Sequence, residues 1–316
     1  MPILTVFTPT YNRAHTLPRV FERLRAQTSP DFVWLVIDDG STDNTADLVS
    51  IWKSSAGFAV HYLHQQNRGK HNAHNTAVAL AETELFTILD SDDELLPEAV
   101  ENITSAWKGT SEVERKRIAG IWTLCVDPAG NLVGGPLKQP VLDCSLQELR
   151  YKHNIDQEML ASFSTAALRQ YPFPETPPGA CPYIPEGYVW MRMTRTYEFR
   201  FLNVPCRVYH EGDGLSVMER QPYRVGGCIV YSYLGPLTNE LEWFWYAPAS
   251  FVTNAIQAVR YSLYSRQFLK LSRTLPWKAR LLTVAALPVS ILLLARDWIS
   301  GRIARERGAA RMVTCL

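Results

Sequence analysis

Short apolar runs alternate with amphipathic segments through the N-terminal part of the chain. The apolar runs have the length of buried strands, and the segments between them carry apolar side chains at helical spacing. The expected strands are residues 3–8, 32–37, 60–63 and 86–89, and the expected helices are about 14–27, 43–51 and 70–81. Strand–helix alternation of this kind predicts a mostly parallel sheet with helices on both faces, which is an α/β fold. Ligands of such sheets bind at the carboxyl ends of the strands.

The pattern changes after the fourth strand. Residues 118–126 and 132–137 look like strands around a turn at 128–131, and a helix over about 186–196 is followed by strand-like runs at 199–204 and 207–209. Beyond Gly214 the composition becomes aromatic, basic and apolar. We therefore expect a first half at 1–110, a second half of the same domain at 111–215, and a helical tail at 216–316.

Four acids follow the fourth apolar run within five residues, at 90 and 92–94. Asp90 and Asp92 fall on the same side of an extended chain, because side chains alternate with a period of two. Two carboxylates at a strand end suit Mg²⁺ or Mn²⁺, with open positions left for phosphate oxygens. The alternative is a solvated acidic turn before a helix whose start Pro97 would mark.

Charge is unevenly distributed along the 316 residues. From Arg260 onward there are 11 Lys/Arg and 2 Asp/Glu, so the tail is strongly basic although the whole chain has a net charge of only +1. A basic tail on an acidic body suggests an anionic surface as partner. The six cysteines show no paired or metal-like spacing, which favours reduced thiols in a cytosolic protein. We expect no signal peptide, because a strand-like run begins at Ile3 without a basic segment before it.

The tail itself has the features of a membrane-associating segment. Residues 243–246 form an aromatic cluster, and residues 255–271 can form a basic amphipathic helix. Residues 281–295 carry no charge but contain Pro288 and fall short of the roughly 20 residues that span a bilayer. We expect insertion at the membrane interface; the alternative is a helical hairpin packed on the preceding domain or on a second subunit. Nucleic-acid binding is disfavoured by the long uncharged stretch.

Four motifs in the N-terminal part resemble those of family 2 glycosyltransferases with the GT-A fold. They are Thr-Pro-Thr-Tyr-Asn-Arg at 8–13, Asp-Asp-Gly-Ser-Thr-Asp at 38–43, Asn-Arg-Gly-Lys at 67–70 and Asp-Ser-Asp-Asp at 90–93. The resemblance covers about two thirds of the chain and fades after about residue 215. It implies an inverting, metal-dependent enzyme of bacterial polysaccharide or glycan assembly, using a nucleotide-sugar donor such as a UDP-sugar.

The same resemblance implies roles for individual residues. The donor would be bound by Thr8, Pro9, Tyr11, Arg13, Asp38, Asp39, Arg68, Lys70, Asp90, Ser91 and Arg192. Mg²⁺ or Mn²⁺ would be held by Asp92 and Asp90, with His210 completing the site; a surface histidine is the alternative for His210. Glu186 would be the catalytic base, although Gly187 stands where the family usually has a second acid. His71 and His74, three residues apart, lack a nearby third ligand and are not expected to bind metal.

Together these features predict transfer of a sugar to a hydroxyl of a lipid-linked glycan acceptor at the cytoplasmic face of the inner (plasma) membrane. A nucleotidyltransferase is one alternative, but residues 8–13 are not the Gly-rich basic loop such an enzyme requires near its first strand. A non-catalytic membrane scaffold is the other, and intact Asp90, Asp92 and Glu186 argue against it.

Overall fold

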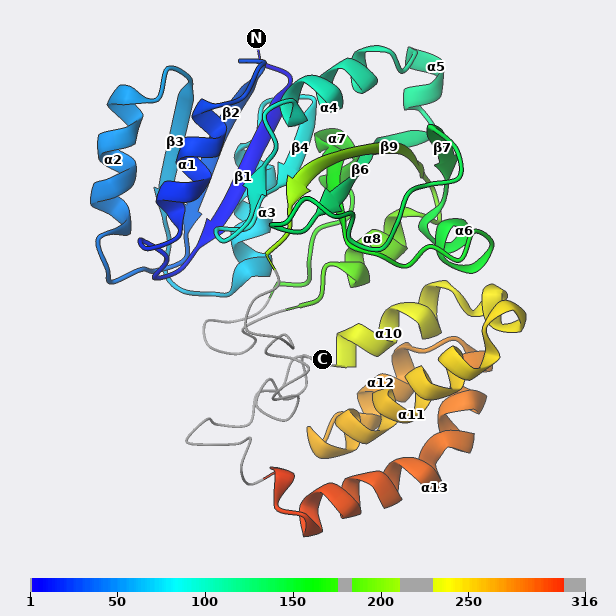
Figure 1. Ribbon diagram of the computed structural model, residues 1–316. Coiled ribbons are helices and arrows are strands. Elements are labelled where there is room, and N and C mark those ends of the chain that lie inside the picture. Colours follow the sequence, from blue (N-terminus) through cyan, green and yellow to red (C-terminus); the bar gives the residue numbers. More distant parts are fainter. Residues whose placement is uncertain (1, 176–183, 211–229, 304–316) are drawn as a thin grey trace.

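The computed structural model describes residues 2–175, 184–210 and 230–303, and it consists of a twisted sheet covered by helices on both faces with a helical tail (Figure 1). The strands are β1 (Leu4–Thr10), β2 (Phe32–Asp38), β3 (Ala59–His64), β4 (Leu85–Ile88), β5 (Glu94–Leu95), β6 (Ile118–Val126), β7 (Val141–Cys144), β8 (Met159–Ser164) and β9 (Glu198–Val208). The helices before the tail are α1 (Leu17–Arg25), α2 (Thr45–Ser55), α3 (Lys70–Leu80), α4 (Ala99–Lys108), α5 (Glu112–Arg115), α6 (Leu146–Tyr151), α7 (Thr165–Leu168) and α8 (Gly187–Met193). Those of the tail are α10 (Val230–Asn239), η2 (Leu241–Tyr246), α11 (Pro248–Tyr264), α12 (Phe268–Thr274) and α13 (Trp277–Ile299).

The sheet has the order β3-β2-β1-β4-β8-β6-β9-β5, and β7 pairs with β9. β1 to β4 are mutually parallel, as the strand–helix alternation predicts, and β8 joins antiparallel to β4. The parallel half therefore presents the carboxyl ends of β1, β2 and β4 at one edge. The mixed α/β architecture predicted from the sequence is confirmed.

Two hydrophobic cores lie on the two faces of the sheet. Side chains alternate along β1, so that Val6 enters the core under α1, α2 and α4, whereas Phe7 enters the core under α3. The second core continues without interruption through α8, α10, α11 and α13. The tail therefore packs on the sheet domain through a shared apolar interior. The expected boundary at 215/216 lies outside the described residues.

Two expected strands differ in the structure. Residues 132–137 form only an isolated bridge between Val126 and Leu132, because Gly134 adopts a φ of +90° and Pro136 has no N–H to donate. The two runs at 199–204 and 207–209 are one strand, β9, which shifts register against β6 around Pro205. A local bulge explains why the sequence pattern breaks there.

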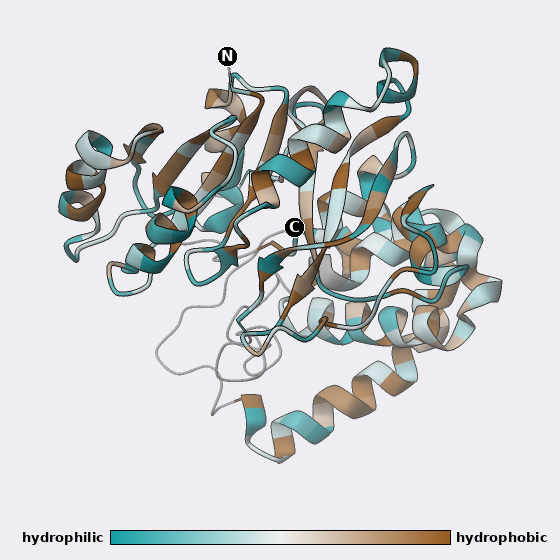
Figure 2. Ribbon diagram, turned by 45° about the horizontal axis from the view of Figure 1, so that its top comes forward, coloured by the Kyte–Doolittle hydropathy of each residue, from teal (hydrophilic) through white to brown (hydrophobic). Residues whose placement is uncertain are grey.

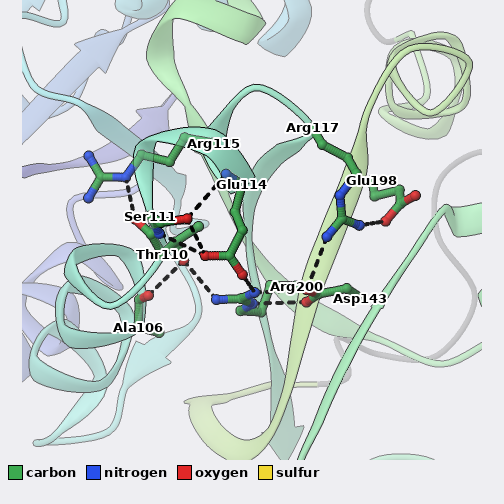
Figure 3. A network of polar contacts seen from close by, with 9 residues as sticks. All are labelled: Ala106, Thr110, Ser111, Glu114, Arg115, Arg117, Asp143, Glu198 and Arg200. Carbon is green, nitrogen blue, oxygen red and sulfur yellow. Dashed lines mark hydrogen bonds and ion pairs between the residues drawn. The ribbon is translucent and has the colours of Figure 1, made fainter.

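Arg200 of β9 fixes the outer side of the sheet (Figure 3). Its guanidinium donates from Nε and Nη2 to the two carboxylate oxygens of Asp143, at 2.9 and 2.8 Å, and from Nη2 to Glu114 Oε1 at 2.7 Å. The hydrogen bond from Ser111 and the contact with Arg200 lower the pKa of Glu114 to about 2. β7, β9 and α5 are thereby held together, and β9 runs from this network toward the acids that follow β4.

The apolar stretch of the tail forms a longer helix than we expected. α13 extends over 23 residues, is continuous through Pro288, and is long and apolar enough to cross a membrane by length and composition alone. The prediction of a segment too short to span was wrong, because Trp277 and the residues after 295 extend the helix at both ends. The basic amphipathic helix expected over 255–271 is instead divided between α11 and α12.

Candidate active site

Three loops meet at the carboxyl ends of β1, β2 and β4 and enclose a cleft of about 460 Å³. The cleft is lined by Pro9, Thr10, Tyr11, Arg13, Asp39, Lys70, Asp90, Ser91 and Asp92. All of these except Thr10 are residues that the sequence analysis assigned to the donor or the metal. Thr10 was missed although it is the next position on the same side of the strand after Thr8, and its hydroxyl is buried without a hydrogen-bond partner among the described residues.

The two aspartates that end β2 have different roles. Asp38 Oδ1 accepts from the backbone N–H of Ser41 at 2.7 Å, and Oδ2 accepts from the Tyr62 hydroxyl at 2.7 Å. Asp38 is 1% exposed and does not line the cleft, so it shapes the turn. Asp39 lines the cleft and accepts from the backbone N–H groups of Arg68 and Gly69, at 2.9 and 2.7 Å.

Gly40 makes this turn possible. Its φ is +90°, and a Cβ built there would lie 3.0 Å from the backbone nitrogen of Asn67. The close approach lets Asp39 reach the loop that starts α3, and so joins the β2 end to the helix that carries Lys70.

The four acids after β4 separate onto two sides. Asp90 and Asp92 face the cleft, where Lys70 and Arg13 pair with them at 2.6 and 3.5 Å. Burial alone would raise the pKa of Asp90, but the contact with Lys70, together with the charges of Arg207 and Arg13, lowers it.

Asp93 and Glu94 point away from the cleft and anchor the loop. Asp93 is buried against Arg207 of β9 at 3.3 Å, and burial raises its pKa to about 6. Glu94 pairs with Arg23 of α1 and contacts His210 Nε2 at 2.7 Å. Asp93 and Glu94 therefore act on the cleft indirectly, by fixing the position of the loop that carries Asp90 and Asp92.

Glu186 lies beside the cleft although it is far away in the sequence. It is the N-cap residue of α8, its side chain makes no cap hydrogen bond, and its Oε1 lies 2.8 Å from Lys70 Nζ. Lys70 thus contacts Asp90 and Glu186 at the same time. A cation between two carboxylates offsets their mutual repulsion and is itself well placed to meet an arriving anion.

Several other predicted residues lie outside the cleft. Thr8 is fully buried, and its Oγ1 accepts from Trp34 Nε1 at 3.0 Å. Arg68 contributes its backbone N–H to Asp39. Arg192 lies on α8 with its guanidinium 5.7 Å from the Tyr188 ring centroid, in a separate groove described below. The His210 ring contacts Glu94 rather than Asp90 or Asp92.

The described residues contain no group of three or more His, Cys, Asp or Glu side chains arranged to hold a metal. Asp90 and Asp92 nevertheless fit Mg²⁺ or Mn²⁺, since Mg²⁺ is usually bound by one or two carboxylates together with substrate phosphates. His71 and His74 are buried in the core under α3, and burial lowers the pKa of His71 to about 4 and that of His74 to about 3. Phe7, Phe86, Phe173 and Trp190 surround the His74 ring, which gives it a packing role.

Comparison with known proteins agrees with this geometry. Residues 5–113 match the family model described as "Glycosyl transferase family 2". This region of the chain belongs to that family. The match includes the three loops that form the cleft and ends before Glu186.

Curated relatives match this chain over part of their length. An uncharacterized glycosyltransferase of Nostoc sp., alr2836, is 33% identical over 110 residues, which are 35% of this chain and 34% of the relative. Chondroitin synthase of Escherichia coli is 30% identical over 45% of this chain and 20% of its own length. Hyaluronan synthase of Pasteurella multocida is 26% identical over 69% of this chain and 22% of its own. The chain therefore spans about a third or less of these relatives.

Solved structures resemble this chain over nearly its whole length. Residues 1–349 of S. aureus TarS superpose with a TM-score of 0.58 at 18% identity, covering 95% of this chain and 92% of that one. TarS has also been solved with UDP, with a TM-score of 0.58 at 18% identity. At this identity the likeness shows the fold, and it confirms the expected GT-A-like architecture with a helical C-terminal part.

Proposed function

We propose that the chain is an inverting glycosyltransferase that moves a sugar from a nucleotide-sugar, such as a UDP-sugar, to a hydroxyl group. The observation that carries this proposal is Lys70, which joins Asp90 and Glu186 across one cleft. Sugar transfer from such a donor requires a cation that meets the diphosphate, carboxylates that hold a metal, and a separate base. Lys70, the pair Asp90 and Asp92, and Glu186 would supply these groups. The match to the family and the UDP complex of TarS support the choice of donor.

The donor would lie along the three loops. The nucleoside would occupy the side near Asp39 and Tyr11, and the diphosphate would meet Lys70 and Arg13. Asp90 and Asp92 would hold Mg²⁺ or Mn²⁺. A divalent cation bound there would neutralise the negative charge that develops on the leaving diphosphate.

Glu186 would accept the proton of the attacking hydroxyl. The acceptor oxygen forms a bond to the anomeric carbon as the bond from that carbon to the phosphate oxygen breaks, and the released electron pair stays on the nucleotide. In the structure Lys70 neutralises Glu186. A bound diphosphate would draw Lys70 toward itself, so that the carboxylate of Glu186 becomes available when the donor is in place.

The tail supports a membrane-associated acceptor. One face of α13 carries Ala279, Thr283, Ala286, Ser290 and Asp297, all buried, and it packs on α11. The opposite face exposes Trp277, Leu281, Val284, Ile291, Leu292 and Trp298. Figure 2 shows the apolar colour of this helix along the outer side of the tail.

A buried ion pair favours a helix that lies in the membrane interface. Asp297 pairs with Arg260 of α11, and both side chains are at most 5% exposed. If α13 crossed a bilayer away from α11, this pair would be separated and each buried charge would lose its partner. We infer that α13 lies along an anionic cytoplasmic membrane surface with its outer face inserted, and that the acceptor is a lipid-linked glycan. A second subunit covering this face is the alternative occupant.

Substitution of the proposed base tests this function. Glu186→Gln should not weaken binding of UDP, because it removes a competitor for Lys70. It should lower the rate of sugar transfer by about 10²–10⁴-fold, which is the usual contribution of a general base. Glu112→Gln on the exposed part of α5 makes the same chemical change outside the cleft and should have no effect. The measurement is donor consumption by the wild type and by both variants, each with and without Mn²⁺. An unchanged rate for Glu186→Gln would assign the base to another residue.

A further inference from the structure

A second groove, which we call the basic groove, lies between α8 and the tail helices α10 and α12. It encloses about 600 Å³. Its polar lining consists chiefly of Arg192, Thr238, Asn239, Lys270, Arg273 and Thr274. Three of these side chains are cations, and none of the described residues that line the groove is an acid. The groove therefore favours an anion.

The groups in the basic groove suit an oxyanion in particular. Within the described residues, no ion pair involves Arg192 or Arg273. The side-chain amide nitrogen of Asn239 is buried and makes no hydrogen bond to another described residue. An anion that accepted from this amide and from the guanidinium groups would satisfy donors for which the described residues provide no acceptor or ion pair. Phosphate, with several acceptor oxygens, fits this set of donors.

Glu240, an acid next to the groove lining in the described part of the chain, is engaged elsewhere. Glu240 follows Asn239, but its side chain is fully buried and its Oε2 accepts from the Tyr151 hydroxyl at 2.8 Å. Burial raises the pKa of Glu240. Its carboxylate therefore does not neutralise the guanidinium of Arg273.

The basic groove is connected to the active site by one short helix. Glu186 caps the start of α8, and Arg192 lies in its last turn, a rise of roughly 9 Å along the helix axis. Figure 1 shows α8 between the sheet and α10. A short oligosaccharide with its reacting hydroxyl at Glu186 could therefore place its other end in the basic groove.

We propose that the basic groove binds a phosphoester of the acceptor, so that the substrate is a phosphate-bearing glycan or glycolipid. This inference rests on the proposed function and narrows its acceptor class. The phosphate fixes the distal part of the acceptor while the reacting hydroxyl lies at Glu186. A phospholipid headgroup presents the same phosphate oxygens to these donors, so the test must distinguish it from the acceptor.

Phosphate binding to the groove can be measured separately from the donor site. With the donor site saturated by UDP, inorganic phosphate is titrated against the full-length chain and followed by phosphorus NMR. The double variant Lys270→Ala/Arg273→Ala should bind phosphate at least about tenfold more weakly, since hydrogen bonds to charged groups are worth about 1.5–3 kcal/mol each. Lys270→Arg/Arg273→Lys keeps both charges and should restore binding.

A matched control removes the same charge elsewhere. Lys53→Ala/Lys116→Ala changes two exposed lysines remote from the tail and should leave phosphate binding unchanged. Equal phosphate binding by the wild type and Lys270→Ala/Arg273→Ala would overturn the proposal, as would equal losses in the two double alanine variants. The midpoint of thermal unfolding identifies any variant that has lost its fold. If Lys270→Ala/Arg273→Ala does not fold, Lys270→Arg/Arg273→Lys tests the proposal, and loss of phosphate binding by this folded, charge-keeping variant would overturn it.

Vesicles distinguish the two sources of the phosphate. Phosphatidylcholine vesicles with or without phosphatidylglycerol are mixed with wild type and Lys270→Ala/Arg273→Ala. If the variant keeps the preference for phosphatidylglycerol and loses only soluble phosphate binding, the groove is assigned to the acceptor. If the variant loses that preference, the groove binds a headgroup and the acceptor assignment is overturned. Failure of the proposed function would be seen differently, as a wild-type chain that does not bind UDP at all.

Discussion

Lys70 is the cation that offsets the negative charges of Asp90 and Glu186 in the cleft. Its ammonium lies 2.6 Å from Asp90 and 2.8 Å from Glu186, and the loop before it is fixed by the hydrogen bonds of Asp39 to Arg68 and Gly69. Lys70 lies on α3, Asp90 follows β4 and Glu186 is at the start of α8, so these two ion pairs join three segments that are distant in the sequence. We expect it to act on the diphosphate when the donor binds.

Removal of this cation should weaken binding of the diphosphate specifically. Lys70→Met should raise the dissociation constant for UDP by about tenfold or more, because a charge-assisted hydrogen bond to phosphate is lost. Uridine lacks the diphosphate and provides the internal control, so its binding should be unchanged. Titration calorimetry with both ligands makes the comparison. Parallel losses for UDP and uridine would instead indicate that Lys70 maintains the shape of the cleft.

Residues adjacent to strand ends could be predicted from sequence, whereas residues whose role depends on distant partners could not. Asp90, Asp92 and Lys70 line the cleft because they immediately follow β4 or start α3. Asp38 has the same chemistry as Asp39, but Ser41 and Tyr62 take up its carboxylate, and no local pattern reveals this. The assignments of His210 to metal and Arg192 to the donor stay predictions.

At the scale of elements, α13 has two unlike faces that the uncharged stretch alone did not reveal. Small and polar residues pack on α11, where Ser290 Oγ donates to the Ile256 carbonyl at 3.0 Å. The outer face leaves Leu281 and Leu292 62% and 70% exposed. Sequence hydropathy gives the apolar character of the helix, but its partner on one side is determined by tertiary packing.

Two charges on the outer face should release the chain from membranes. Leu281→Lys/Leu292→Lys should lower partition onto phosphatidylcholine–phosphatidylglycerol vesicles by at least about tenfold, since burying one leucine side chain is worth about 1.5–3 kcal/mol. The midpoint of thermal unfolding should not fall, because both side chains are exposed. Vesicle flotation gives the measurement.

A control with equal added charge isolates the position of the substitution. Ile51→Lys/Val113→Lys places two lysines at residues that are 63% and 77% exposed on α2 and α5. Flotation equal to wild type is expected for this control. If Leu281→Lys/Leu292→Lys also floats like wild type, α13 is not the membrane-binding element.

At the scale of the whole molecule, the sheet domain and the tail share one apolar interior. The core under α3 extends through α8 and α10 to α11 and α13. Phe251 of α11 is fully buried and stacks on Tyr151 of α6 with ring centroids 5.8 Å apart. The alternation that predicts the parallel half contains no information on this contact, which joins residues 100 positions apart.

Loss of this contact should destabilise the chain as one unit. Phe251→Ala should lower the free energy of unfolding by about 3–5 kcal/mol, the usual cost of truncating a buried phenylalanine. Urea unfolding followed by tryptophan fluorescence and by loss of UDP binding should give coincident curves for wild type and variant. Two separate transitions, with UDP binding retained after the first, would show that the tail unfolds alone.

The shared interior has a consequence for reach. Since α13 is joined to the sheet by packed side chains, a bilayer under its outer face would set the height and tilt of the cleft above the lipid surface. The proposed transferase would then modify only hydroxyls that lie at a fixed distance from the lipid anchor of the acceptor. Glycans shorter or longer than that distance would be bound by the same residues and yet present the wrong sugar to Glu186.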